Sequence, residues 1–165
     1  MKYCPNCKNK IELKEIDGKE RYKCIDDFCG YIYWNNPIPV VGILVETKSG
    51  ILLAHNTNTP QGIFSIITGF LESDEHPKDA AIREMKEELG LNAVETNFLG
   101  IFPFSKANQI LMAYHIKAEG TIELNEELDE ITLIKRTDLN GYSESGKFEV
   151  QKWLDELNVS NKLNL

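Results

Sequence analysis

Residues 69–91 read GFLESDEHPKDAAIREMKEELGL, and this stretch decides how the chain folds and what it can bind. Glu87 and Glu88 follow Glu84 by three and four positions, so a helix would place all three carboxylates close together on its surface. Like charges gathered in this way repel one another, and a hard divalent cation such as Mg²⁺ or Mn²⁺ relieves the repulsion by binding the oxygens. The pattern favours a metal site on a helix; the alternative is a solvated acidic helix whose charges are incidental.

The flanking residues mark both ends of this helix. Pro77 suits a first helical position, His76 or a neighbour before it would cap the N-terminus, and Gly90 is a natural stop. Arg83 is placed to reach back to Glu75 and pin the preceding loop through a bidentate pair. Apolar residues recur at helical spacing and predict the buried face: Ala81, Ile82, Met85 and Leu89.

The whole stretch resembles the Nudix box, Gly-x5-Glu-x7-Arg-Glu-U-x-Glu-Glu-x-Gly-U, in which U is a bulky aliphatic residue. Every fixed position is filled, from Gly69 through Glu75 and Arg83 to Gly90. The resemblance implies an α/β fold, the Nudix α/β/α sandwich with a mixed sheet. It also implies a loop–helix–loop that binds divalent metal and hydrolyses a nucleoside diphosphate linked to another group.

The resemblance assigns roles by position. Glu84 and Glu88 would be direct metal ligands, Glu87 a ligand or a partner that orients water, and the backbone carbonyl next to Gly69 a further ligand. Arg83 and the glutamate of the loop would be an orienting pair. Bound metal would neutralise a pyrophosphate and lower the pKa of a bound water, and a nearby carboxylate would take the remaining proton.

All four cysteines lie near the start of the chain, as Cys4, Cys7, Cys24 and Cys29. No apolar segment typical of a signal peptide precedes them, so we expect a reducing, cytoplasmic setting that disfavours disulfides. Four thiolates would hold a structural Zn²⁺, although the second pair is spaced by four residues instead of the usual two. We expect a zinc ribbon over 1–34 and a Nudix hydrolase domain over 35–165, with a metal-free ribbon as the main alternative.

The charge of the chain limits the kinds of partner that it is expected to bind. The chain carries a formal net charge of −8 over 165 residues, which disfavours nonspecific binding to nucleic acid. Residues 1–34 hold seven Lys or Arg against six Asp or Glu, so the ribbon has no basic footprint and fits a spacer or dimer-supporting role better. The longest apolar stretch, at 38–45, is too short to span a membrane. We expect a small-molecule nucleoside diphosphate derivative as the substrate.

Beyond the ribbon, apolar runs bounded by turn residues predict strands on either side of the motif helix. The expected strands are 40–46 and 51–55, joined as a hairpin at 48–50, then 63–68, 94–102, 109–118 and 131–135. A final amphipathic helix should follow, with Val150, Trp153, Leu154 and Leu157 facing inward.

A zinc ribbon directly before a Nudix domain resembles the NADH pyrophosphatase branch of the family. That branch has the segment Ser-Gln-Pro-Trp-Pro-Phe-Pro-x-Ser after the box; here Phe102-Pro103-Phe104 stands for Trp-Pro-Phe, and the leading Ser-Gln-Pro is missing. The resemblance implies a homodimer that cleaves NADH or NAD⁺ into nicotinamide mononucleotide and AMP. An ADP-ribose or nucleotide-sugar pyrophosphatase is the alternative enzyme, and a non-catalytic ligand sensor is the alternative of another class.

Residues after the box are candidates for substrate contacts. Phe102, Phe104 and Tyr114 are candidates to stack on a base, with ordinary strand core as the alternative. Gln109 is a candidate for ribose or amide contacts, and Lys106 for a phosphate.

A second acidic run, at 126–130, precedes the last expected strand. Related enzymes often supply a further metal ligand or base at this place. Glu130 is the first candidate and Glu127 the next, and a solvated acidic turn is the alternative.

Overall fold

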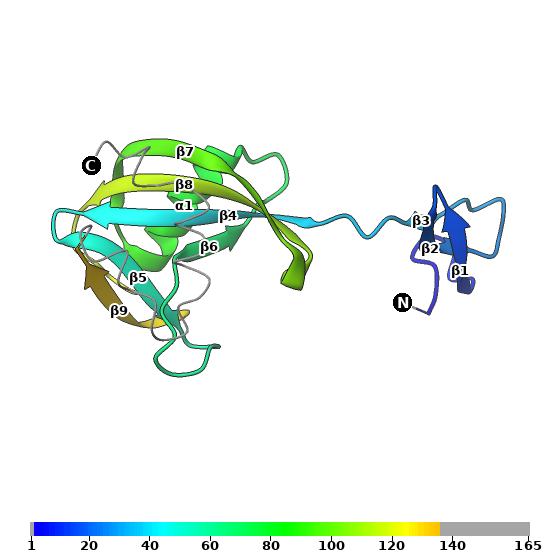
Figure 1. Ribbon diagram of the computed structural model, residues 1–165, viewed down its shortest axis with the longest axis horizontal. Coiled ribbons are helices and arrows are strands. Elements are labelled where there is room, and N and C mark those ends of the chain that lie inside the picture. Colours follow the sequence, from blue (N-terminus) through cyan, green and yellow to red (C-terminus); the bar gives the residue numbers. More distant parts are fainter. Residues whose placement is uncertain (1, 136–165) are drawn as a thin grey trace. The chain divides into compact units, whose positions relative to one another are not determined.

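The chain divides into two compact units, Met1–Pro37 and Ile38–Leu165 (Figure 1). The computed structural model describes residues 2–135. The helix expected around Val150 to Leu157 lies outside these residues. Within 2–135, no helix is long and apolar enough to cross a membrane.

The N-terminal unit is a three-stranded antiparallel sheet. Its strands are β1 (Ile11–Ile16), β2 (Lys19–Cys24) and β3 (Ile32–Tyr33), in that order. Asp17 and Gly18 join β1 to β2 with φ angles of 53° and 72°. A two-residue hairpin turn requires this left-handed backbone, and Asp-Gly adopts it readily.

The second unit is built on a mixed six-stranded sheet, in agreement with the α/β class expected from the sequence. Its order is β7-β8-β4-β5-β9, with β6 paired to β4. The strands are β4 (Ile38–Thr47), β5 (Gly50–Asn56), β6 (Ile67–Phe70), β7 (Asn92–Phe104), β8 (Gln109–Glu119) and β9 (Leu128–Ile134), with a short 3₁₀ turn at Ser105–Ala107 between β7 and β8. The β4–β8 pair is parallel and the other pairs are antiparallel.

The strand β4 shares one of its edges between two partners. Its far end, Val45 to Thr47, pairs with β5 in the predicted hairpin, and its near end, Val40 to Ile43, pairs with β6. The strand expected at 63–68 therefore begins later, at Ile67. Before that point the chain still follows β5, because Ser65 and Ala54 exchange two backbone hydrogen bonds of 2.8 and 2.9 Å.

The helix α1 (Pro77–Leu89) begins and ends where the sequence predicts. The His76 side chain caps it by accepting a hydrogen bond from the Lys78 amide, and Gly90 closes it with a φ of 71° and a hydrogen bond from its amide to the Lys86 carbonyl. The apolar face of α1 is buried against one face of the sheet (Figure 1). Its fully buried residues are Ala80, Ala81, Met85 and Leu89.

A second apolar cluster covers the other face of the sheet. It consists of Leu44, Ile51, Leu53, Leu99, Ala113 and Ile134. Because side chains alternate along a strand, neighbouring residues of β4 and β8 serve opposite clusters. This alternation decides which residues of each strand can reach the site described next.

Candidate active site

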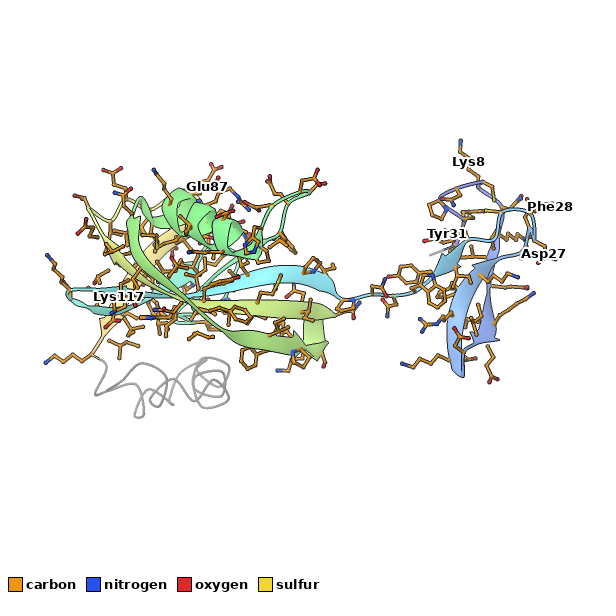
Figure 2. The ribbon with its side chains drawn as sticks, turned by 90° about the horizontal axis from the view of Figure 1, so that it is seen from above. Lys8, Asp27, Phe28, Tyr31, Glu87 and Lys117 are labelled. Atoms are coloured by element: carbon orange, nitrogen blue, oxygen red, sulfur yellow. The ribbon has the colours of Figure 1, made fainter. Side chains whose placement is uncertain are left out.

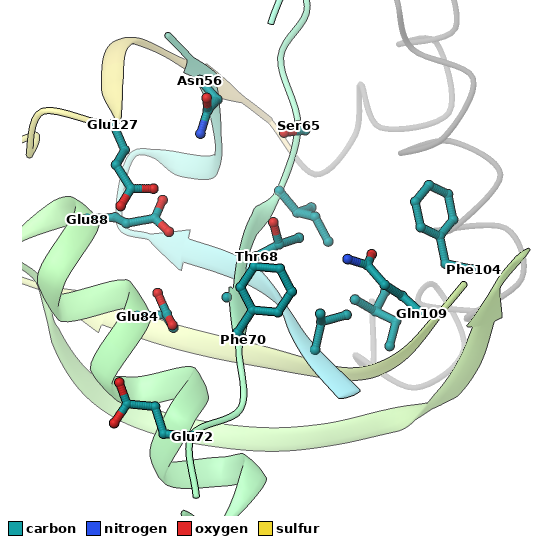
Figure 3. A pocket seen from close by; sticks show the side chains of 14 residues that line it. Asn56, Ser65, Thr68, Phe70, Glu72, Glu84, Glu88, Phe104, Gln109 and Glu127 are labelled. Atoms are coloured by element: carbon teal, nitrogen blue, oxygen red, sulfur yellow. The ribbon is translucent and has the colours of Figure 1, made fainter. Parts of the chain in front are cut away.

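A pocket of about 640 Å³ lies beside β4, near the point where the partner of this strand changes from β6 to β5 (Figure 3). One side of it carries four carboxylates, from Glu72, Glu84, Glu88 and Glu127. The remaining lining is largely apolar and includes Val40, Ile66, Phe70, Phe104 and Leu111. The pocket thus combines an acidic wall with a surface suited to a flat apolar group.

Arg83 ties the loop before α1 to the helix. Its Nε and Nη2 donate to the two carboxylate oxygens of Glu75 at 2.8 and 2.9 Å, the bidentate pair that the sequence predicts. Nη1 donates to Glu84 at 2.9 Å and to Glu87 at 3.0 Å, and Nη2 also donates to the Phe70 carbonyl at 3.2 Å. The guanidinium beside Glu75 lowers the pKa of that carboxyl group, so the pair stays ionised.

Gly69 makes room for Glu84. A Cβ atom at this position would overlap the Glu84 carboxyl group. The backbone of Gly69 does not have the positive φ that would by itself call for glycine. The fixed glycine is therefore explained by close approach of a carboxylate to the strand β6 rather than by backbone freedom.

Glu88 is the most strongly perturbed carboxyl group of the pocket. The residue is 6% exposed, and within residues 2–135 its carboxylate makes no hydrogen bond or ion pair. Burial, together with the charges of Glu84, Glu127 and Glu87, raises its pKa to about 8. Burial also raises the pKa of Glu84. Unpaired buried carboxylates are costly unless a cation compensates them.

The carboxylates of this wall offer the kind of ligand atom that a hard divalent cation prefers. Mg²⁺ and Mn²⁺ prefer carboxylate oxygens, and Glu84, Glu88 and Glu127 line the same pocket from α1 and from the loop before β9. Glu87 differs from them, because it is not among the lining residues and its side chain is 56% exposed beside Arg83. It is close enough to affect the pKa of Glu88 through its charge.

The second acidic run reaches the pocket through Glu127 and not through Glu130. Glu130 pairs with His55 across β5 and β9 and is not among the lining residues. Of the two candidates in this run, the pocket is therefore lined by the second, Glu127. A register shift between His55 and Asn56 pairs Asn56 with Leu128, the residue directly after Glu127, and neighbouring residues along the sequence do not reveal this pairing.

The candidate substrate-binding residues also fall into two groups, those that line the pocket and those that do not. Phe104 and Gln109 line the pocket and face each other as register partners. Phe102 packs against the apolar cluster on its sheet face, Tyr114 packs in the cluster covered by α1, and Lys106 is not among the lining residues. Tyr114 lies five positions from Gln109 on one strand, so the two side chains point to opposite faces.

Phe70 is a lining residue that the sequence reasoning missed. Its side chain is 60% exposed although it is large and apolar. The signal was available, because Ile67 faces the core, and Thr68 and Phe70 must then share the other face of the strand. Figure 3 shows Phe70 between the carboxylates and the Gln109 side of the pocket.

The four cysteines of the N-terminal unit come together as the sequence predicts. Their sulfur atoms all lie within 4.8 Å of one another. The Cys4 and Cys29 sulfurs are 3.6 Å apart, those of Cys7 and Cys24 are 3.4 Å apart, and all four residues are free thiols. Tetrahedral zinc with Zn–S bonds of about 2.3 Å would place sulfurs about 3.8 Å apart, so the cluster fits Zn²⁺.

A local turn absorbs the longer spacing of the second cysteine pair. The amides of Cys29 and Gly30 both reach the Asp26 carbonyl, at 3.1 and 3.4 Å, and the Phe28 amide reaches the Asp26 side chain at 3.0 Å. The extra residues loop outward, and Phe28 is left fully exposed to solvent (Figure 2). The unusual spacing is therefore compatible with a four-sulfur site.

The fold and the pocket define an α/β protein with a Nudix loop–helix–loop, and comparison with known proteins agrees. Residues 36–156 match the model of the NUDIX domain. The chain belongs to the Nudix hydrolase family.

Curated relatives carry one recurring name. The NAD-capped RNA hydrolase NudC of Vibrio parahaemolyticus is 25% identical over 132 residues, which is 80% of this chain and 49% of that protein. The human NAD-capped RNA hydrolase NUDT12 is 23% identical over 136 residues, 76% of this chain and 29% of that protein. The chain thus spans about half or less of the length of these relatives.

Solved structures support the fold. A NUDIX hydrolase from Nitrosomonas europaea superposes with a TM-score of 0.74 at 23% identity, covering 94% of this chain and 92% of that one. The MutT protein of Methanosarcina mazei gives a TM-score of 0.61 at 19% identity, covering 79% of this chain and 99% of that one.

Proposed function

We propose that this protein is a Mg²⁺- or Mn²⁺-dependent hydrolase that cleaves the diphosphate of a nucleoside diphosphate linked to another group. The observation that carries the proposal is Glu88, a buried carboxylate with no hydrogen-bonding partner in the described residues, beside Glu84 and Glu127 in one pocket. A cation there relieves both the burial and the mutual repulsion of the carboxylates. A ligand sensor would have no need for such a set.

Each residue has a physical task in this proposal. Glu84, Glu88 and Glu127 would hold the divalent cation, which would neutralise phosphate charge and lower the pKa of a water molecule. Arg83 holds Glu75 and aligns Glu84 and Glu87 through its own hydrogen bonds. A carboxylate of the wall that does not bind the cation would accept the proton of the attacking water.

The lining residues support a nucleotide as the substrate. Phe70 and Phe104 offer aromatic faces for a base or nicotinamide ring, and Gln109 offers a hydrogen-bonding amide between apolar walls. Among the described lining residues there is no Lys or Arg, and in this proposal the cation makes the main contact with the diphosphate. The pocket therefore selects for a ring attached to a metal-chelating diphosphate.

Within this class we propose NADH or NAD⁺ as the preferred substrate, split into nicotinamide mononucleotide and AMP. The names of the curated relatives support an NAD-related activity, and the cysteine cluster supports the same branch. ADP-ribose and nucleotide sugars share the diphosphate and a base, and they are the competing substrates.

A substrate panel separates these possibilities. Purified protein is incubated with Mg²⁺ and NADH, NAD⁺, ADP-ribose or a nucleotide sugar, and the products are resolved by chromatography. Release of nicotinamide mononucleotide and AMP from NADH at the highest kcat/KM is the expected result. Cleavage of ADP-ribose without cleavage of NADH would move the assignment to the competing enzyme, and no turnover on any diphosphate would favour a sensor.

Replacing Phe70 with alanine is expected to raise KM about tenfold with a smaller effect on kcat. Stacking of a base on an aromatic side chain contributes about 1–3 kcal/mol, and the hydrogen bond from Arg83 goes to the Phe70 backbone carbonyl, which alanine keeps. Steady-state kinetics on the best substrate of the panel measure the change. Phe70→Tyr, which keeps the ring, is the matched control, and an equal KM for both variants and the native protein would remove Phe70 from the binding surface.

We also propose that the cysteine cluster holds a structural Zn²⁺. Elemental analysis of freshly purified protein is expected to find about one zinc per chain, and replacing Cys4 and Cys7 with serine should abolish it and unfold the N-terminal unit. The sulfur geometry supports this expectation. Zinc-free protein with an ordered N-terminal unit would contradict it.

Cytoplasmic location and a homodimer remain predictions. Light scattering of the purified protein tests the second, with a mass of twice 18.8 kDa as the expected result.

A further inference from the structure

We propose that Asn125 is a positioning residue that fixes the Glu127 carboxylate opposite Glu88 and thereby prepares the pocket for its cation. This inference rests on the proposed metal-dependent function. It concerns a residue that does not line the pocket and that no feature of the Nudix box points to.

The backbone of Asn125 joins the loop before β9 to the end of α1. Its amide donates to the Glu88 carbonyl at 3.2 Å, and the Glu123 amide donates to the Leu89 carbonyl at 2.9 Å. Both acceptors belong to the last turn of the helix, whose carbonyls have no partner inside α1. The loop is therefore attached at the residue whose side chain is the buried carboxylate of the pocket.

The side chain of Asn125 then fixes Glu127. Its Oδ1 accepts the Glu127 amide at 3.0 Å, and its backbone carbonyl accepts the Leu128 amide at 3.4 Å. The carbonyl of Glu127 in turn accepts the Thr57 amide at 2.9 Å. Both backbone groups of Glu127 are thus held, and the Oδ1 of Asn125 is the side-chain atom that holds one of them.

Repulsion makes this restraint necessary. Glu84, Glu88 and Glu127 line the same pocket, so without a cation their like charges repel one another. Figure 3 shows the carboxylates of Glu127 and Glu88 directed toward one another. A turn that holds the Glu127 backbone in place lets the cation bind without first reordering the loop, and supporting contacts of this kind typically affect metal affinity by about 10- to 100-fold.

Mn²⁺ binding, followed by the electron paramagnetic resonance signal of the unbound ion, tests the role directly. Asn125→Ala should weaken binding at the pocket about tenfold, whereas Asn125→Asp and Asn125→Ser, which keep an oxygen acceptor for the Glu127 amide, should bind within about threefold of the native protein or more tightly. Thr47→Ala is the matched control. Thr47 Oγ1 accepts the Ser49 amide at 3.2 Å in the β4–β5 hairpin, so this variant loses a similar turn contact away from the pocket.

A double variant shows whether Asn125 acts through Glu127. Glu127→Gln alone should weaken Mn²⁺ binding, and adding Asn125→Ala to it should weaken binding by less than about twofold more, because the group being positioned has already lost its charge. Thermal unfolding without metal, recorded by circular dichroism, identifies any variant that is not folded. If Asn125→Ala does not fold, Asn125→Gln, whose longer side chain cannot make the same turn, replaces it.

The outcomes are distinct. Native protein that binds no Mn²⁺ at the pocket overturns the proposed function, and this inference with it. Native binding with an unchanged affinity in folded Asn125→Ala overturns the inference alone, as does an equal loss in Thr47→Ala. An additive loss in the double variant would show that Asn125 acts on something other than Glu127.

Discussion

Glu88→Gln should lower kcat for diphosphate hydrolysis about 10²- to 10³-fold, while the protein stays folded. Glutamine nearly preserves the shape of Glu88 but removes the charge that holds the cation. Steady-state kinetics with saturating Mg²⁺ measure the loss. Glu126→Gln is the charge-matched control. It should retain the native rate, because Glu126 is exposed and does not line the pocket.

Glu88→Gln should lower activity but raise the stability of the metal-free protein. In the metal-free protein the pKa of Glu88 is raised from an ordinary value of 4.5 to about 8. The unfolded chain therefore releases this proton as pH rises above about 4.5 while the folded protein keeps it, and native stability falls between these two values. The glutamine variant does not titrate there, so in the metal-free state it should unfold at a higher temperature than the native protein at pH 8 and at a similar temperature at pH 4.5.

Loss of activity together with a gain in metal-free stability would identify Glu88 as a group kept for chemistry at a cost in stability. Retention of near-native kcat in the Gln variant would remove Glu88 from the site. Thermal unfolding across the pH range, with and without Mg²⁺, supplies the second measurement.

The second large effect is expected for Gly69→Ala. An added methyl group would overlap the Glu84 carboxyl group, and since the backbone at Gly69 suits alanine, the Glu84 side chain must move instead. A displacement of about 1 Å in a catalytic group can cost about 10²-fold in rate. We expect a loss of that size in kcat and a weaker dependence of stability on Mg²⁺.

Gly62→Ala provides the contrast for this prediction. Gly62 has a φ of 81° and open space where a Cβ would lie. Alanine there strains the backbone without crowding a side chain, so it should lower the unfolding temperature and leave kcat near native. If both alanine variants lose stability and keep their activity, Gly69 is not needed to accommodate Glu84.

Features that depend on neighbouring residues along the chain were predictable. The limits of α1 follow from Pro77 and Gly90, and the contact between Arg83 and Glu75 follows from their spacing. The clustering of the cysteines is of the same kind, because two pairs at the ends of a short hairpin meet when the hairpin forms.

Features that depend on how the strands pair could not be predicted from the sequence. Tyr114 was a candidate because it is aromatic and follows the box, but the alternation of β8 turns it toward α1. Glu127 lines the pocket from the loop before β9, whereas Glu130 lies within β9 as the register partner of His55. Phe70 lay inside the best-recognised segment of the chain and was missed, because its role follows from the pairing of β6 with β4.

One edge of β4 pairs with β6 along its first part and with β5 along its second part. This arrangement affects how related proteins can differ in sequence. The chain between Asn56 and Ile67 leaves one half of that edge and returns to the other half, so residues can be inserted or deleted within 58–64 without changing the alignment of either strand pair or the bonds of Thr57 and Ser65. Asn56, Ser65 and Ile66 at the ends of this connection line the pocket. Changes in the length of this one loop can therefore reshape the space for the group beyond the diphosphate while the carboxylate wall, built by α1 and the loop before β9, keeps its geometry.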